Sequence, residues 1–160
     1  GWFAAPWLQS GWTFADGDRE SAASQFEQYT SRFRDLDPAT AKAVELLVAT
    51  LRDASRGPEF LAAAKVAPGN FAGMGWSSWL VFVGMNDEAM IVASDQGRLD
   101  PDTLRVVWSP TARAVLSSPK YLELAAPSGL IEYWDARGYP EGCRVVDAPE
   151  RYLDCTERWR

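Results

Sequence analysis

Residues 84–101 read GMNDEAMIVASDQGRLDP, a stretch that predicts one short amphipathic helix between a turn and a proline stop. Asn86 or Asp87 is suited to cap its start, because a short side-chain oxygen accepts hydrogen bonds from N–H groups that the first helical turn leaves unpaired. We therefore expect the helix to begin at about residue 87. Gly97 weakens it, and Pro101 ends it because proline lacks an N–H donor. The small-residue stripe of this helix is formed by Ala89, Val92, Ala93 and Gln96.

Apolar periodicity predicts further helices on both sides of this stretch. Residues 18–34 carry apolar side chains at helical spacing, and Asp37 followed by Pro38 opens a helix that extends to Ala54. Residues 59–66 add two turns, which form a helical hairpin with the preceding helix. Three short helices are expected over residues 110–117, 119–126 and 130–137, with Gly138 closing the last of them.

Two segments are harder to assign. Residues 2–15 predict either a short helix broken by Pro6 and Gly11 or an irregular cap that carries Trp2, Trp7 and Trp12. Residues 70–83 are apolar and rich in glycine, and periodicity alone leaves a buried strand at residues 79–83 open. We favour a helix for residues 70–83, because a repeating helical architecture requires one there.

The spacing of three residues resembles the tetratricopeptide repeat. Gly84, Ala89 and Pro101 stand where the second helix of that repeat has its turn glycine, its small packing residue and its closing proline, which makes residues 70–103 one repeat. Gly17, Ala22 and Phe26 repeat the turn-to-helix spacing, and Ala22 lies 67 positions before Ala89, close to two periods of 34. The resemblance implies an all-α fold, a short right-handed array of antiparallel helix pairs over residues 1–142.

The closing segment is similar to the ends of many bacterial tetratricopeptide-type proteins. The residues that carry this resemblance are Ser117–Tyr121, Gly129–Leu130, Tyr133–Trp134, Gly138–Pro140, Cys143 and Cys155. In such proteins the repeats typically follow a DNA-binding winged helix or a nucleotide-cyclase domain, often with a transmembrane helix between. The resemblance therefore implies a module of a larger bacterial signalling protein, in the periplasm if that helix is present and in the cytoplasm if it is not.

Composition limits the partners of this segment. The net charge is −6 and histidine is absent, so the cationic surface that nucleic acid requires is not expected. The longest apolar run, residues 79–83, is far shorter than the roughly 20 residues that cross a bilayer. Membrane attachment is expected only through a missing upstream segment, and the first residue, Gly1 rather than methionine, indicates an excised piece. The eight tryptophans are expected chiefly to fill a helical core.

The two cysteines predict a disulfide rather than a metal site. Cys143 and Cys155 are 12 positions apart in a tail, residues 143–160, that shows no periodicity, and no histidine completes a zinc site. A disulfide would persist in an oxidising compartment, and the alternative is two buried free thiols. No nucleophile has a recognisable activating partner, and each carboxylate pair can be explained by capping or solvation, so we expect neither an enzyme nor a cofactor.

Two functions remain after these exclusions. The first is a protein-interaction module whose helical groove binds a peptide or partner domain, with dimerisation of the parent as a variant and the oligomeric state open. Its groove residues would be Phe71, Met74, Ser78 and Val81, which otherwise belong to the core. The second is a small-molecule sensor with an apolar pocket lined by Trp76, Trp79, Trp108 or Trp134.

Overall fold

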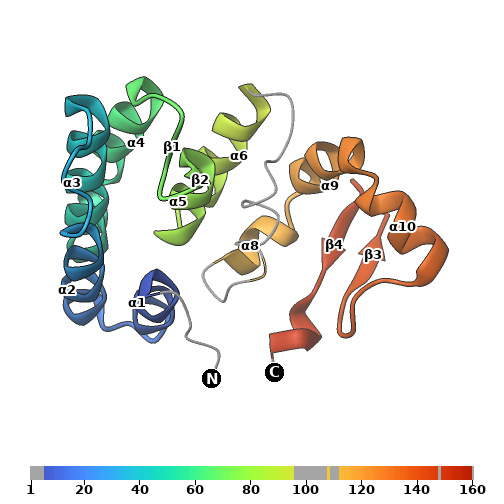
Figure 1. The fold of residues 1–160 in the computed structure, drawn as a ribbon. Coiled ribbons are helices and arrows are strands. Elements are labelled where there is room, and N and C mark those ends of the chain that lie inside the picture. The colour runs from blue at the N-terminus through green and yellow to red at the C-terminus, as the bar shows by residue number, and fades with distance from the viewer. Residues whose placement is uncertain (1–5, 96–107, 109–111, 148, 160) are drawn as a thin grey trace.

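The computed structural model describes residues 6–95, 108, 112–147 and 149–159. Figure 1 shows helices over most of the chain and a small β-hairpin near the C-terminus. The first four helices are α1 (Pro6–Ala15), α2 (Arg19–Thr30), α3 (Pro38–Arg52) and α4 (Gly57–Val66), with the short 3-10 helix η1 (Ala54–Arg56) before α4. The mostly helical class predicted from the sequence is confirmed.

Carboxylate caps explain where α2 and α3 begin, and of the two only Asp37 was predicted. The Asp18 carboxylate accepts a hydrogen bond from the Ser21 N–H at 3.0 Å. The Asp37 carboxylate accepts from Ala39 and Thr40 at 3.1 and 3.0 Å, and Pro38 is the first residue of α3, as predicted. These carboxylates satisfy donors that have no partner inside the helix.

Helix α1 runs unbroken through Gly11, which corrects the prediction of a helix broken there or an irregular cap. A side chain at residue 11 has no room, since a Cβ atom would lie 2.8 Å from a ring carbon of Phe82. The hydroxyl of Ser10, which is fully buried, donates to the Ala22 carbonyl of α2 at 2.8 Å. Helix α1 is therefore fixed closely against α2 and the core.

Residues 70–75 form a ribbon rather than the predicted helix. The strands β1 (Asn70–Phe71) and β2 (Met74–Gly75) pair antiparallel, with Phe71 opposite Met74. The turn between them places Ala72 at φ 53° and Gly73 at φ 82°, a left-handed pair of the kind that tight hairpins require. Helix formation fails here because repeated glycines lower helical propensity and suit this turn.

Helix α5 (Trp76–Phe82) occupies the centre of the molecule, and all seven of its residues are buried. Its rings contact Trp7 of α1 (6.0 Å from the Trp79 ring), Phe26 of α2 (5.2 Å from Trp79) and Phe60 of α4 (6.3 Å from Trp76). In a stacked repeat array each pair of helices contacts only its neighbours. The predicted array of helix pairs at an interval of 34 residues is thus not confirmed, although consecutive helices do pack together.

The C-terminal part contains α6 (Asn86–Asp95), α8 (Arg113–Leu116), α9 (Pro119–Ala125), the 3-10 helix η3 (Ala126–Ser128) and α10 (Leu130–Arg137). Helix α6 begins one residue before the expected position, and the predicted end at Gly97 and Pro101, like Gln96, lies outside the described residues. Gly138 follows α10 as predicted; its φ of 94° suits glycine, but its ψ of 151° lies outside the left-handed helical region of a C′ glycine.

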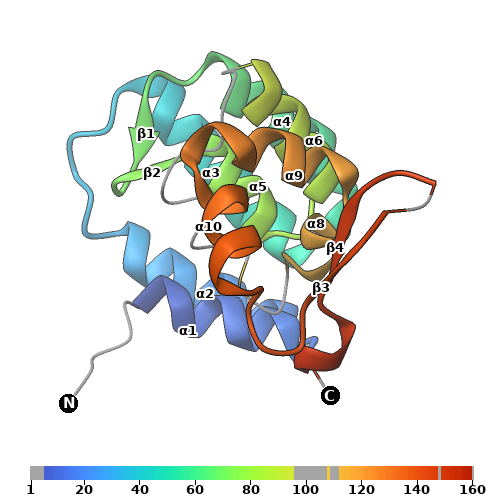
Figure 2. The same ribbon diagram turned by 90° about the vertical axis from the view of Figure 1, so that its right-hand side faces the viewer.

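The tail is not irregular as predicted. Strands β3 (Arg144–Val146) and β4 (Tyr152–Asp154) form an antiparallel hairpin, followed by the 3-10 helix η4 (Thr156–Trp159). Figure 2 shows this hairpin beside α9 and α10. Leu153 of β4 is fully buried and belongs to the same hydrophobic core as the helices, so the hairpin packs as part of the same body.

Candidate functional site

The four residues predicted to line a binding groove lie in the core, which corrects that prediction. None of them is more than 6% exposed. They belong to the ribbon and to α5, and every residue of α5 is buried. The ribbon is joined to α5 by a hydrogen bond from the Trp79 indole N–H to the Phe71 carbonyl at 3.1 Å. A partner cannot reach side chains in these positions. The residues are Phe71, Met74, Ser78 and Val81.

The tryptophans proposed to line a small-molecule pocket contact other rings instead. Trp76 stacks on Phe71 with ring centroids 6.3 Å apart, and Trp79 is fully buried. Trp108 meets Trp134 edge-on at 5.9 Å. Aromatic neighbours therefore occupy the space beside these rings, as expected for a packed core.

Two of the three repeat-defining residues fall in the described part of the chain. Gly84, at φ 81°, ends α5; its N–H donates to the Val81 carbonyl at 3.0 Å, and the Met85 N–H donates to Leu80 at 2.9 Å. This pair of bonds is a Schellman motif, which requires the left-handed conformation that glycine adopts readily. Ala89 is fully buried on α6, and Pro101 lies outside the described residues.

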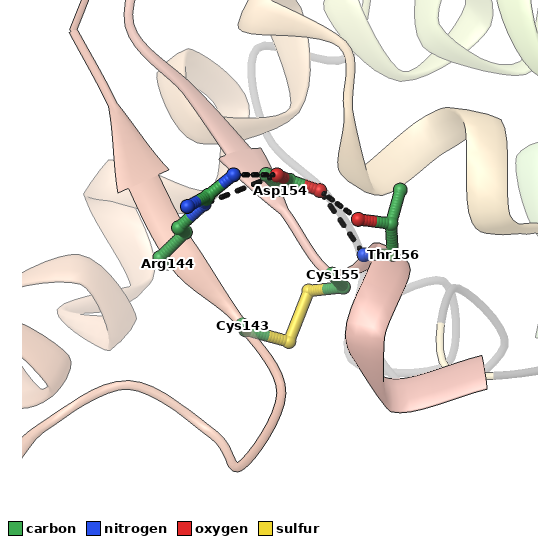
Figure 3. Close-up of a disulfide and its surroundings, with 5 residues drawn as sticks. All are labelled: Cys143, Arg144, Asp154, Cys155 and Thr156. Carbon is green, nitrogen blue, oxygen red and sulfur yellow. Dashed lines mark hydrogen bonds and ion pairs between the residues drawn. A yellow bond between two sulfur atoms is a disulfide. The ribbon is translucent and has the colours of Figure 1, made fainter. Parts of the chain in front are cut away.

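A disulfide joins Cys143 and Cys155, which confirms the sequence prediction over the alternative of free thiols (Figure 3). Cys143 directly precedes β3 and Cys155 directly follows β4, so the bond extends the strand register by one pair; the two Cα atoms are 4.0 Å apart. The hairpin is therefore covalently closed at its open end. A disulfide of this kind indicates an oxidising, extracytoplasmic compartment.

Polar contacts surround the disulfide (Figure 3). The Asp154 carboxylate accepts from the Thr156 N–H at 3.1 Å, from the Thr156 hydroxyl at 2.8 Å and from the Arg144 guanidinium at 3.1 Å. The Thr156 backbone N–H contributes most to lowering the pKa of Asp154, followed by the Thr156 hydroxyl and then by Arg144. A carboxylate held ionised in this way is a structural acceptor and a poor general acid.

A shallow hollow of about 130 Å³ adjoins the disulfide. This volume is below the roughly 300 Å³ at which sites for organic ligands begin. An external thiolate would reach the half-buried Cys143 sulfur rather than the buried Cys155, forming a mixed disulfide at Cys143 and releasing Cys155 as the thiolate. The residues that line it are Gly142, Cys143, Arg144, Asp154, Thr156 and Glu157.

The other end of the hairpin is attached to α10 by hydrogen bonds. The Tyr139 hydroxyl donates to Asp135 at 2.6 Å, and the Arg151 guanidinium lies 3.3 Å from the same carboxylate. Burial, followed by the bond to Asp135, raises the pKa of Tyr139. These contacts and the disulfide hold the hairpin at both ends.

The surface of α1 differs from that of the other helices, and the sequence reasoning missed it. Helix α1 contains no charged residue, yet it carries an outward stripe at spacings of four and three residues. This stripe, the α1 face, consists of Leu8, Trp12 and Ala15; Trp12 is 53% exposed. The α1 face could have been predicted from the ten-residue run without a charged residue, PWLQSGWTFA.

The described residues offer neither a metal site nor a membrane span. Among them, no three His, Cys, Asp or Glu side chains gather so as to hold a metal ion. Within the same part of the chain, no helix has the length and apolar character needed to cross a bilayer.

No protein-family model, curated protein or solved structure matches the chain. Fold and site define it as a mostly helical domain with a disulfide-closed hairpin in its C-terminal part.

Proposed function

We propose that this chain is a non-catalytic protein-interaction module of a larger bacterial regulatory protein and that it works in the periplasm. The disulfide supports an oxidising location. The resemblance of residues 117–155 to the ends of bacterial tetratricopeptide-type proteins supports a place behind a regulatory domain, with paired helices of that kind as the scaffold.

The observation that carries the proposal is the α1 face. Exposed tryptophans, such as Trp12, supply a large apolar area at little entropic cost and are enriched among residues that dominate binding energy. Because α1 has no charge, the matching surface is an uncharged apolar face of another protein chain. The proposed binding surface is therefore the outer side of α1 and not the buried ribbon and α5.

Site-specific photocross-linking tests this function in the parent protein. A benzophenone amino acid replaces Trp12 in one variant and Tyr133 in the other; Tyr133 is an exposed aromatic residue of α10, which lies across the molecule from α1 in Figure 1. We expect a protein adduct from position 12 and none from position 133. The cross-linked protein, identified by mass spectrometry and purified, should bind the wild-type chain and lose affinity for Trp12→Ala.

Equal adducts from both positions, no protein adduct from position 12, or equal binding of Trp12→Ala by the purified partner would contradict the proposal. A shift of the intrinsic fluorescence by metabolites, without any protein adduct, would favour the small-molecule sensor.

A further inference from the structure

We infer that Cys143 is a site of reversible modification by a small aminothiol, which forms a mixed disulfide with it. The inference does not depend on the proposed function. It begins from the unequal exposure of the two residues that share the disulfide. Cys143 is half-buried and lines the hollow of about 130 Å³, whereas Cys155 is only 3% exposed. Exchange requires that a thiolate reach one of the two sulfur atoms, so attack is directed to Cys143.

A turn directly before β3 presents Cys143 to the hollow. The Cys143 N–H donates to the Pro140 carbonyl at 2.9 Å, and Gly142, the third residue of this turn, has φ 74°. A positive φ at that position is typical of a type II turn and favours glycine, which adds no side chain to shield the sulfur. The hollow is several times larger than the roughly 30 Å³ of one water molecule. It therefore admits the CH₂–S end of a thiol, although it cannot enclose a large ligand.

The charge of the hollow favours a thiol that carries an ammonium group. Two of its three charged side chains, Arg144 and Asp154, form an ion pair at 3.1 Å, as Figure 3 shows. The third is Glu157, whose exposed carboxylate has no hydrogen-bond or ion-pair partner in the part of the chain that the structure describes. This uncompensated negative charge attracts a cationic thiol and repels an anionic one.

The exchange conserves one sulfur–sulfur bond. The aminothiol, as its thiolate, forms a bond to the Cys143 sulfur while the Cys143–Cys155 bond breaks and its electron pair leaves on the Cys155 sulfur. Cys155 then takes up the proton that the aminothiol lost. The strand register keeps Cys155 opposite Cys143, so the Cys155 thiolate expels the aminothiol in the reverse reaction. The modification thus opens the covalent closure of the hairpin without net oxidation or reduction.

Treatment of the purified, oxidised chain with cysteamine, an aminothiol, tests where exchange occurs. After an acid quench, the free thiols are alkylated and the peptides are analysed by mass spectrometry. We expect cysteamine on Cys143 about tenfold or more in excess over Cys155, and the alkyl group on Cys155. Equal modification of the two cysteines, a preference for Cys155, or a disulfide that does not exchange overturns the inference.

Glu157→Gln tests the preference for an ammonium group. The rate with cysteamine is divided by the rate with uncharged mercaptoethanol, so that the intrinsic reactivities of the two thiols cancel when variants are compared. We expect this ratio to fall about threefold in Glu157→Gln, as the loss of one exposed charge near the ammonium group predicts. Glu150→Gln, an identical change in the exposed loop between β3 and β4, should leave the ratio unchanged. An unchanged ratio in Glu157→Gln, or an equal fall in both variants, overturns the assignment of an aminothiol.

Discussion

At the scale of single residues, Tyr121 is a buried group without a compensating bond. Its side chain is fully buried on α9, and its hydroxyl has no hydrogen-bond partner among the described residues. Burial raises the pKa of this phenol. An unpaired buried hydroxyl is costly, whereas a phenylalanine ring of nearly the same shape is not.

Tyr121→Phe should therefore leave the free energy of unfolding unchanged or raise it by up to about 1 kcal/mol. Urea unfolding followed by circular dichroism measures the change. Tyr139→Phe is the matched control, because it removes the hydroxyl that donates to Asp135 and should lower stability. A loss of stability in Tyr121→Phe would reveal a hydrogen bond to that hydroxyl.

Several residues were predictable from local chemistry alone. The Asp37 cap with Pro38, the end of α10 at Gly138 and the Cys143–Cys155 bond each depend on residues close in the sequence, so all three positions were predicted correctly. Phe71 and Ser78 were misplaced because the direction in which they face depends on helices that are distant in the sequence. The segment WSSWLVF has no charged residue, which is typical of a helix buried on every side, but the sequence analysis did not predict this burial.

At the scale of elements, the hairpin depends on its covalent closure. It has only three residue pairs, which is too few for independent stability. A bond that closes a loop of this size stabilises by about 3 kcal/mol by restricting the unfolded chain. Reduction, or Cys143→Ser with Cys155→Ser, should lower the melting temperature measured by calorimetry. Reductant should not change the melting temperature of the double variant. An unchanged melting temperature of the reduced wild type would show that the three strand pairs and the burial of Leu153 keep the hairpin folded without the disulfide.

The ion pairs between α2 and α3 predict acid sensitivity. Arg52 lies 2.7 Å from Glu27, and its hydrogen bond is the main cause of the lowered pKa of Glu27. Because the folded pKa is lower, this contribution is present above about pH 4.3 and is lost as the pH falls through the folded pKa. It should amount to less than about 1 kcal/mol, since the pair is exposed.

Glu27→Gln should therefore destabilise the protein near pH 7, and its difference from the wild type should shrink toward pH 3 in urea unfolding. In an Arg52→Gln background the same change should have little effect. A constant difference at all pH values would rule out the ion pair as its source.

The sequence pattern did not predict the four strands, for a physical reason. Strands β1 and β2 have two residues each, and β3 and β4 have three, so no alternation of apolar and polar residues can be recognised. Helices α2 and α3, with 12 and 15 residues, carry enough periodicity to be found. The tight turn at Ala72 and Gly73 also lacks the asparagine–glycine pair that usually marks it.

At the scale of the whole molecule, the central position of α5 determines how the molecule opens. Solenoids lose protection of their amide hydrogens from the ends inward, one unit after another. Here the helix that α1, α2 and α4 all touch lies midway along the chain. Amides of residues 79–82 should thus exchange with deuterium only through complete unfolding, and deletion of α1 and α2 should leave an unfolded remainder rather than a shorter domain.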